Sequence, residues 1–230
     1  MKTRIHNINR IGIFILLFFI SFYKGYAQSS DMGFIIMGEA GIEVKERWEF
    51  SLKEEIRLNQ YGTRLDRLAT KVDIGYIFWK PRLEIGGAFY FINDMSENNT
   101  FDNRYRVNVN LTYKEKINQF EISYRARYQN TFFPKKEEIV PNPEMMFRNK
   151  VELTYSFEKV PLSLFISGDL FLTLNQPEKN GIESIRTKLG VEYEVAEKHS
   201  LIFYLRADNE LMTAAPDNAY YLGITYKFDY

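Results

Sequence analysis

The amino-acid sequence predicts an all-β fold, an antiparallel up-and-down transmembrane β-barrel of about 10–12 strands. Apolar and polar residues alternate through most of the chain after Gly33, so each predicted strand has one apolar and one charged face. The predicted connections alternate between short turns and longer loops, and aromatic residues concentrate near strand ends, as in outer-membrane barrels. A soluble β-sandwich shares the alternation but needs neither the contrast in loop length nor strands of about 9–11 residues throughout.

The first 27 residues have the pattern of a secretory signal peptide. A basic start precedes an unbroken apolar run over residues 11–20, and Gly25-Tyr26-Ala27 supplies the small residues that a signal peptidase reads. The apolar run is short for a membrane-spanning helix, which needs about 20 residues. We therefore expect residues 1–27 to be removed as the signal peptide and residues 28–230 to form the outer-membrane β-barrel.

Composition excludes several classes of protein. The chain contains 30 lysines and arginines and 30 aspartates and glutamates, and the signal segment holds basic residues but no acidic ones, so the mature segment is mildly acidic. A nucleic-acid-binding protein would show a basic stripe instead. The absence of cysteine excludes disulfides, thiolate nucleophiles and a lipid anchor on cysteine. The mean hydropathy of −0.33 is compatible with a barrel, whose apolar residues stand only at every second position.

Eleven segments show the alternation, and each is expected to form one strand. They cover residues 33–44, 48–58, 64–79, 83–91, 104–114, 120–129, 147–157, 162–174, 185–195, 201–210 and 220–230. Each segment carries β-branched, aliphatic or aromatic residues on one face, which is the composition of a half-buried strand. The clearest hairpin spans residues 103–132. Because bacterial single-chain barrels have an even number of strands, a count of eleven leaves ten to twelve strands as the expectation.

Turn and loop residues delimit these segments. Short turns are expected near residues 45–47, 80–82, 116–118, 159–161 and 197–199, and longer loops at residues 59–63, 93–103, 133–145 and 175–182 and around Pro216. The loop over residues 133–145, rich in proline and charge, is expected to be the longest. Short turns are typical of the periplasmic end of an outer-membrane barrel, and longer loops of the outer end.

Charged residues of both signs crowd the faces that are predicted to point into the barrel. The candidate lumen-lining residues are Arg104, Arg106, Glu121, Arg125, Arg127, Arg148, Lys150, Glu152, Arg206, Asp208 and Glu210. Side chains nearly fill a barrel of this size, and the simpler interpretation is a set of ion pairs between neighbouring strands. The alternative is a narrow pore or a small-solute site, because basic residues on three successive strands would favour an anionic ligand.

Little in the sequence favours catalysis or a cofactor. A serine nucleophile needs a base, and the one histidine of the mature segment, His199, lies in a predicted turn, where we expect it to be solvated. Glu192 and Glu194 share a face with Arg186 and Lys188, so we expect ion pairs there. The loop from Asn93 to Asp102 has scattered oxygen ligands but lacks the glycine-punctuated spacing of a calcium-binding loop. We therefore predict no catalytic residue, no metal and no cofactor.

Five stretches together resemble a known family. They lie at residues 123–130, 148–155, 189–193, 199–201 and 221–228. In this order they resemble the domain-of-unknown-function 2490 family of outer-membrane β-barrel proteins, over essentially the whole mature chain. The resemblance implies an outer-membrane location and carries over no catalytic or binding residue. The aromatic end of the last segment, Tyr226, Phe228 and Tyr230, is similar to the signal that the outer-membrane barrel assembly machinery reads, which implies that machinery as a partner.

The function is predicted only in outline. We expect a monomeric barrel in outer-membrane lipid, with no nucleic-acid partner, that serves as a structural or surface-interaction barrel with a charge-filled lumen. The alternative is a narrow, porin-like conduit or a small-solute binder. A barrel enzyme that acts on lipid is the least favoured class, because no serine–histidine pair is evident. Arginine in place of Val109 or Leu164, both predicted to face lipid, should impair assembly.

Overall fold

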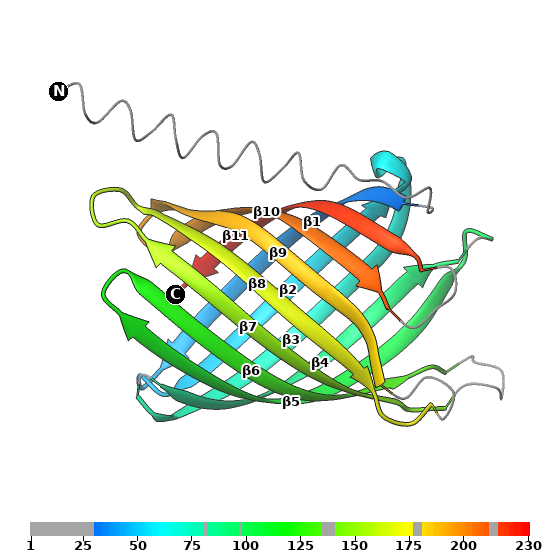
Figure 1. The fold of residues 1–230 in the computed structure, drawn as a ribbon, viewed down its shortest axis with the longest axis horizontal. Helices are drawn as coiled ribbons and strands as arrows, with labels where there is room; N and C mark the ends of the chain where they lie inside the picture. Colours follow the sequence, from blue (N-terminus) through cyan, green and yellow to red (C-terminus); the bar gives the residue numbers. More distant parts are fainter. Residues whose placement is uncertain (1–29, 81, 97, 135–140, 177–180, 212–215) are drawn as a thin grey trace.

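The computed structural model describes residues 30–80, 82–96, 98–134, 141–176, 181–211 and 216–230, which form a closed barrel of eleven strands (Figure 1). The strands are β1 (Ser30–Val44), β2 (Trp48–Asn59), β3 (Arg64–Trp79), β4 (Leu83–Met95), β5 (Phe101–Ile117), β6 (Phe120–Phe132), β7 (Glu144–Ser156), β8 (Leu162–Thr173), β9 (Gly181–Ala196), β10 (His199–Glu210) and β11 (Asn218–Asp229). A short 3-10 helix, η1 (Gln60–Gly62), joins β2 to β3. In this described part of the chain, no helix is both long and apolar enough to cross a membrane.

Each strand pairs with its neighbours in sequence, and β1 closes the barrel against β11. The β1–β11 pair is parallel, with Phe34 opposite Leu222, and the other pairs are antiparallel. Each of the eleven predicted segments therefore forms one strand, within the predicted range of 10–12. The expectation of an even number was wrong, and the predicted antiparallel arrangement does not hold at this seam. An odd number of strands makes β1 and β11 run in the same direction, so they can pair only in parallel. The predicted signal peptide, residues 1–27, lies outside the described residues.

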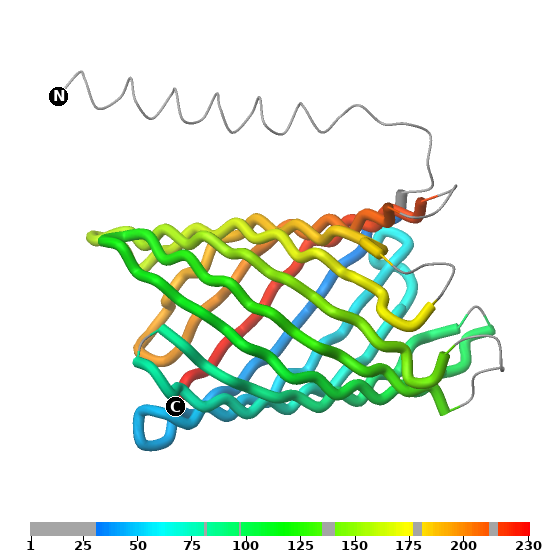
Figure 2. Tube along the Cα trace, turned by 60° about the horizontal axis from the view of Figure 1, so that its bottom comes forward, coloured from blue at the N-terminus to red at the C-terminus, as the bar shows by residue number. Residues whose placement is uncertain are grey.

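The two ends of the barrel differ in their connections (Figure 2). Short turns, such as residues 118–119 and 197–198, lie with the C-terminus at one end, here named the short-turn end. The strand β1 begins at the opposite, long-loop end, where β6 connects to β7 through the longest connection. At the short-turn end, Lys80 Nζ donates to Glu46 Oε2 (2.8 Å), and this hydrogen bond lowers the pKa of the exposed Glu46 carboxyl.

The outward faces of the strands form an apolar belt. Mid-strand side chains such as Leu52 (48 % exposed), Val109 (53 % exposed) and Ile166 (48 % exposed) project away from the barrel. In water, such a belt would be a far larger apolar patch than a soluble monomer normally exposes. In lipid it is favourable, and closure of the barrel leaves no backbone edge unpaired. The strands therefore span a membrane.

Two polar pairs of the described residues lie within this belt, and each is hydrogen-bonded. Thr70 Oγ1 donates to Glu54 Oε2 (3.0 Å), and the Tyr124 hydroxyl donates to Asn149 Oδ1 (2.6 Å). A hydrogen bond between neighbouring strands reduces the cost of placing a polar side chain against lipid. Both pairs are thus compatible with a membrane-facing surface.

Inside the barrel, Tyr204 covers a glycine on the next strand. Tyr204 on β10 lies directly opposite Gly223 on β11, and its ring occupies the space that a side chain at position 223 would need. The substitution Gly223→Ala should therefore lower the free energy of unfolding by about 1–3 kcal/mol, the usual cost of overpacking. Gly38→Ala is the matched control, because a Cβ there would meet no atom within 4 Å. Urea unfolding in detergent micelles measures both, and equal stabilities would contradict the prediction.

Candidate functional site

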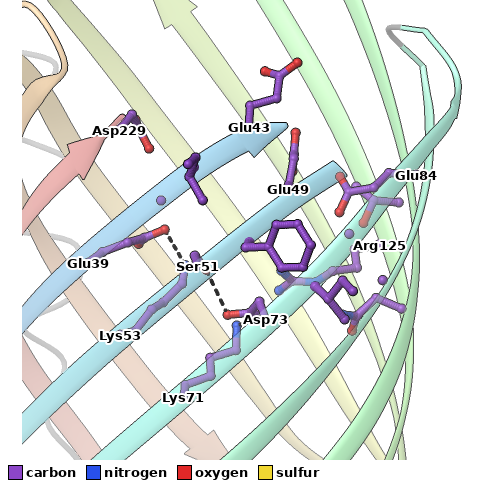
Figure 3. A pocket seen from close by; sticks show the side chains of 18 of the residues that line it. Glu39, Glu43, Glu49, Ser51, Lys53, Lys71, Asp73, Glu84, Arg125 and Asp229 are labelled. Carbon is purple, nitrogen blue, oxygen red and sulfur yellow. Dashed lines mark hydrogen bonds and ion pairs between the residues drawn. The ribbon is translucent and has the colours of Figure 1, made fainter. Parts of the chain in front are cut away.

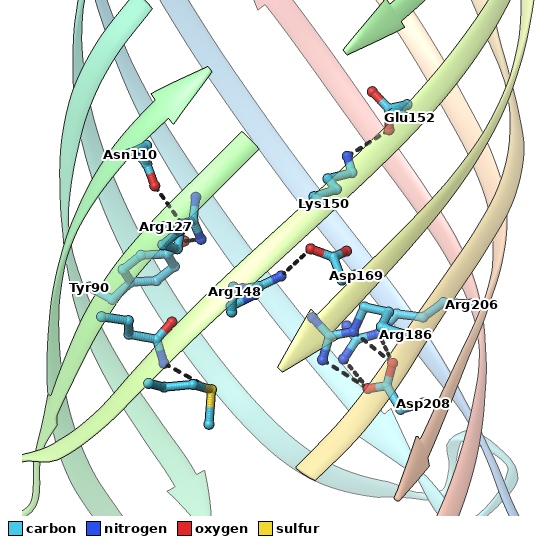
Figure 4. A network of polar contacts seen from close by, with 12 residues as sticks. Tyr90, Asn110, Arg127, Arg148, Lys150, Glu152, Asp169, Arg186, Arg206 and Asp208 are labelled. Carbon is cyan, nitrogen blue, oxygen red and sulfur yellow. Dashed lines mark hydrogen bonds and ion pairs between the residues drawn. The ribbon is translucent and has the colours of Figure 1, made fainter. Parts of the chain in front are cut away.

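The predicted lumen-lining residues lie on four strands, at the alternate positions that face the inside of the barrel. They are Arg104 and Arg106 on β5, Glu121, Arg125 and Arg127 on β6, Arg148, Lys150 and Glu152 on β7, and Arg206, Asp208 and Glu210 on β10. Figure 4 shows Arg127, Arg148, Lys150, Glu152, Arg206 and Asp208 among them. All are buried or half-buried except Glu210, which ends β10. The residues of β5, β6 and β7 share one wall, whereas those of β10 lie on another wall beside β9.

Several of these arginines form ion pairs in which one carboxylate serves two guanidinium groups. Asp94 binds Arg67 (Oδ1–Nε 2.5 Å) and Arg104. Asp208 likewise accepts hydrogen bonds from Arg186 Nε (2.7 Å) and Arg206 Nε (2.9 Å). Two arginines therefore share one aspartate in each cluster.

Two further arginines each pair with one aspartate. Arg148 Nη2 lies 2.9 Å from Asp169 Oδ1, and Arg57 pairs with Asp66. Arg148 and Arg186 also lie over the ring of Phe171, 4.2 and 4.9 Å from its centroid. Buried charges need partners of this kind, so these contacts fill the interior with a fixed polar network.

The strand register places basic residues directly opposite each other at five positions inside the barrel. These pairs are Lys53 and Lys71, Arg57 and Arg67, Arg125 and Lys150, Arg127 and Arg148, and Lys188 and Arg206. Like charges directly opposite in a sheet are destabilising. Acidic residues face each other near the strand ends, where Glu43 lies opposite Glu49 and Asp94 opposite Asp102. Four of the basic pairs thus lie in the middle part of their strands, whereas Arg57 and Arg67 lie near the long-loop end, where Arg67 is directly opposite Asp94.

The half of the lumen toward the short-turn end contains a cavity of about 610 Å³ (Figure 3). Its lining comes mainly from β1–β7 and β11 and includes Glu39, Lys53 and Asp73. Glu39 pairs with Lys53 (Oε1–Nζ 2.7 Å), and Ser51 Oγ donates to Asp73 Oδ2 (3.2 Å). Most of this surface is polar, so the cavity suits a hydrated or charged solute.

Nearer the long-loop end, described side chains fill the lumen. Thr131 and Ile35 are fully buried, and Ile92, Asn108 and Gln129 are nearly so. Tight packing of this kind leaves little room for a solute in the same cross-section. The described residues thus form a cavity in one half and a packed region in the other.

Residues on β1–β3 and β9 also belong to this site, although the predicted set does not include them. Lys53, Arg57 and Lys71 stand at alternating inward positions, the same signal that identified Arg125. The expected ion pairs of Arg186 with Glu192 or Glu194 are not the observed ones, because the register brings Arg186 to Asp208 on β10 instead.

His199 differs from the expectation of a solvated turn residue. It begins β10, its Nδ1 lies 2.6 Å from the Tyr226 hydroxyl, and its ring packs 5.0 Å from Phe228. This histidine is therefore part of the aromatic surface at the short-turn end. Among the described residues, no group of three or more histidine, aspartate or glutamate side chains is placed to hold a metal ion.

The family follows from a sequence comparison. The profile described as "Protein of unknown function (DUF2490)" matches residues 38–220, which is most of the chain. The chain belongs to the domain-of-unknown-function 2490 family. Curated proteins provide no match. Among solved structures, a NanC porin has a TM-score of 0.53 and 12 % sequence identity, with 86 % of this chain and 98 % of that chain covered. This DUF2490 protein therefore shares a barrel fold with a porin, and the family description assigns no function.

Proposed function

We propose that this DUF2490 protein is an outer-membrane barrel that admits small anionic solutes into its lumen, as a narrow conduit or as a small-solute binder. The observation that carries the proposal is the register, which sets basic residues opposite each other at mid-strand, as for Arg125 and Lys150 or Arg127 and Arg148. Such pairs destabilise the sheet. Arg148 and Lys150 have the carboxylates of Asp169 and Glu152 as partners. An anion beside Arg125 and Arg127 offsets the remaining cost of these pairs.

The electrostatics of a confined lumen support this assignment. Charge of one sign, lining a narrow space with low-dielectric walls, raises the local concentration of counter-ions. Rings of basic side chains select anions in pores for the same reason. Arg127 adds to this effect because its hydrogen-bond partners among the described residues are neutral, Asn110 Oδ1 (2.6 Å) and the Tyr90 hydroxyl (3.3 Å).

The apolar belt and the contrast between short turns and longer loops support an outer-membrane location, with the short turns in the periplasm. We expect the barrel assembly machinery to read the outward aromatics Tyr226 and Phe228 on β11, together with Tyr230. The folded barrel is expected to be monomeric in outer-membrane lipid. The proposal assigns no chemical reaction to the protein.

Ion selectivity in planar bilayers tests the proposal. The refolded barrel should carry more anion than cation current in a salt gradient. The double substitution Arg125→Gln/Arg127→Gln should lower the anion-to-cation permeability ratio by about tenfold, the lower end of the enrichment that charged clefts produce. Lys159→Gln in the turn before β8 is the matched control and should leave the ratio unchanged. Cation selectivity of the unmodified barrel would contradict the proposal.

A second candidate function is a closed structural or surface-interaction barrel. The packed region around Thr131 and Ile92 near the long-loop end favours it. In that case the refolded barrel should carry no current and bind no anion, although it keeps the heat-modifiable gel mobility of a folded barrel.

A further inference from the structure

The charged side chains that line the cavity balance each other almost completely. Five ion pairs form within the lining, among them Glu39 with Lys53 (2.7 Å) and Glu84 with Lys114 (3.5 Å). The paired groups satisfy each other and need no ligand. The charged lining residues outside these pairs therefore indicate which ligand the cavity could bind.

Four charged lining residues form no ion pair within 4.0 Å among the described residues: Glu43, Glu49, Arg125 and Arg127. Lys114 and Lys227 act on Glu49, and Asp169 and Glu152 act on Arg125, only at longer range. Glu43 and Glu49 lie directly opposite each other on β1 and β2, so the two carboxylates repel. Arg125 and Arg127 are two residues apart on β6, so their side chains share the inward face. The wall formed by β1 and β2 thus has two negative charges, and the wall at β6 has two positive charges.

The two sets of charges face a common space. The carboxylates lie on β1 and β2, the guanidinium groups lie on β6, and β3, β4 and β5 separate them along the curved sheet. Figure 3 shows Glu43, Glu49 and Arg125 around the same cavity. Its volume of about 610 Å³ lies within the usual range for small-molecule sites, roughly 300–1,000 Å³.

We propose that this cavity binds a small zwitterion, with the acidic group of the ligand on Arg125 and Arg127 and its amino group between Glu43 and Glu49. The inference rests on the proposed function and deepens it by naming the ligand class. A guanidinium group donates two parallel hydrogen bonds to a carboxylate, which a lysine cannot reproduce. A simple anion would leave the repulsion between Glu43 and Glu49 in place, whereas a zwitterion relieves both pairs of like charges.

Three probes with the same four-carbon chain test the inference: 4-aminobutanoate, butanoate and butylammonium. Isothermal titration calorimetry on the refolded full barrel in detergent micelles should give a Kd for 4-aminobutanoate at least about tenfold lower than for either other probe, the factor that 1.4 kcal/mol represents. Glu49→Gln should remove this preference and leave the Kd of butanoate within about twofold. Arg125→Gln should raise the Kd of both probes that carry a carboxylate, 4-aminobutanoate and butanoate.

Controls separate a binding defect from a folding defect. Glu46→Gln makes the same chemical change in the turn between β1 and β2, outside the cavity lining, and should preserve the preference. Glu43→Gln is a second variant with the same expected result as Glu49→Gln, and each variant must keep heat-modifiable gel mobility. If 4-aminobutanoate and butanoate bind equally and Glu49→Gln changes neither, the zwitterion site is overturned while the anion proposal stands. If no probe binds and the unmodified barrel is not anion-selective, both proposals fail.

Discussion

Replacing Asp208 by asparagine should lower the free energy of unfolding by about 3 kcal/mol, because breaking a buried ion pair from one side leaves uncompensated charge. Asp208 accepts hydrogen bonds from both Arg186 and Arg206. The Arg206 side chain is only 6 % exposed, so water cannot replace the lost carboxylate. The Asp208 side chain is 25 % exposed, so we expect the lower end of the roughly 3–5 kcal/mol that removing one partner of a buried ion pair costs. Urea unfolding in micelles, followed by tryptophan fluorescence, measures the change.

Glu210→Gln is the control for this experiment. It makes the equivalent change two residues further along β10, at an exposed position, and should stay within about 0.5 kcal/mol of the unmodified barrel. The double variant Asp208→Asn/Arg206→Met should recover part of the lost stability, because it also removes one of the two guanidinium groups that the first substitution leaves without a carboxylate. An unchanged unfolding midpoint for Asp208→Asn would show that this cluster does not stabilise the barrel.

Val109→Arg should cost about 2–4 kcal/mol, the penalty of an arginine at the middle of the lipid-facing surface. Val109 lies halfway along β5, is 53 % exposed, and has Gly87 and Tyr128 as its neighbours on adjacent strands. No residue of opposite charge stands beside it on the outward face of these described strands.

Leu164→Arg should cost much less, about 0–1 kcal/mol, because the penalty falls toward the membrane interface. Leu164 lies near the start of β8, at the short-turn end. Folding into phospholipid vesicles, followed by gel mobility with and without heating, compares the two variants. Equal costs would contradict the depth that the structure assigns to these residues, and normal folding of both would contradict their outward orientation.

Alternation alone identifies the strands and their faces because the side-chain period of a strand is two, whatever the strand pairs with. Arg125 and Arg127 could thus be assigned to one face, and Val109 to the other, without any knowledge of their neighbours. In the barrel, Arg127 is buried and Arg125 half-buried, whereas Val109 is exposed, as this assignment requires.

The contacts across strands could not be obtained in this way. Whether Arg186 meets Glu192 or Asp208 depends on the register, and register depends on turn geometry and on irregularities such as the shift between His199 and Ser200. The same holds for the basic pair of Lys53 and Lys71, which are distant in sequence and lie opposite each other only because of the β2–β3 pairing. The cavity depends on all of these registers together.

The parallel seam between β1 and β11 also determines which side of the membrane each end of the barrel can reach. The chain enters β1 at the long-loop end and leaves β11 at the short-turn end. A barrel with an even number of strands returns both ends to the same aqueous compartment, whereas this one separates them. In the inserted barrel, the start of β1 and the end of β11 therefore face opposite sides of the membrane, so a soluble protein on one side can reach only one of them.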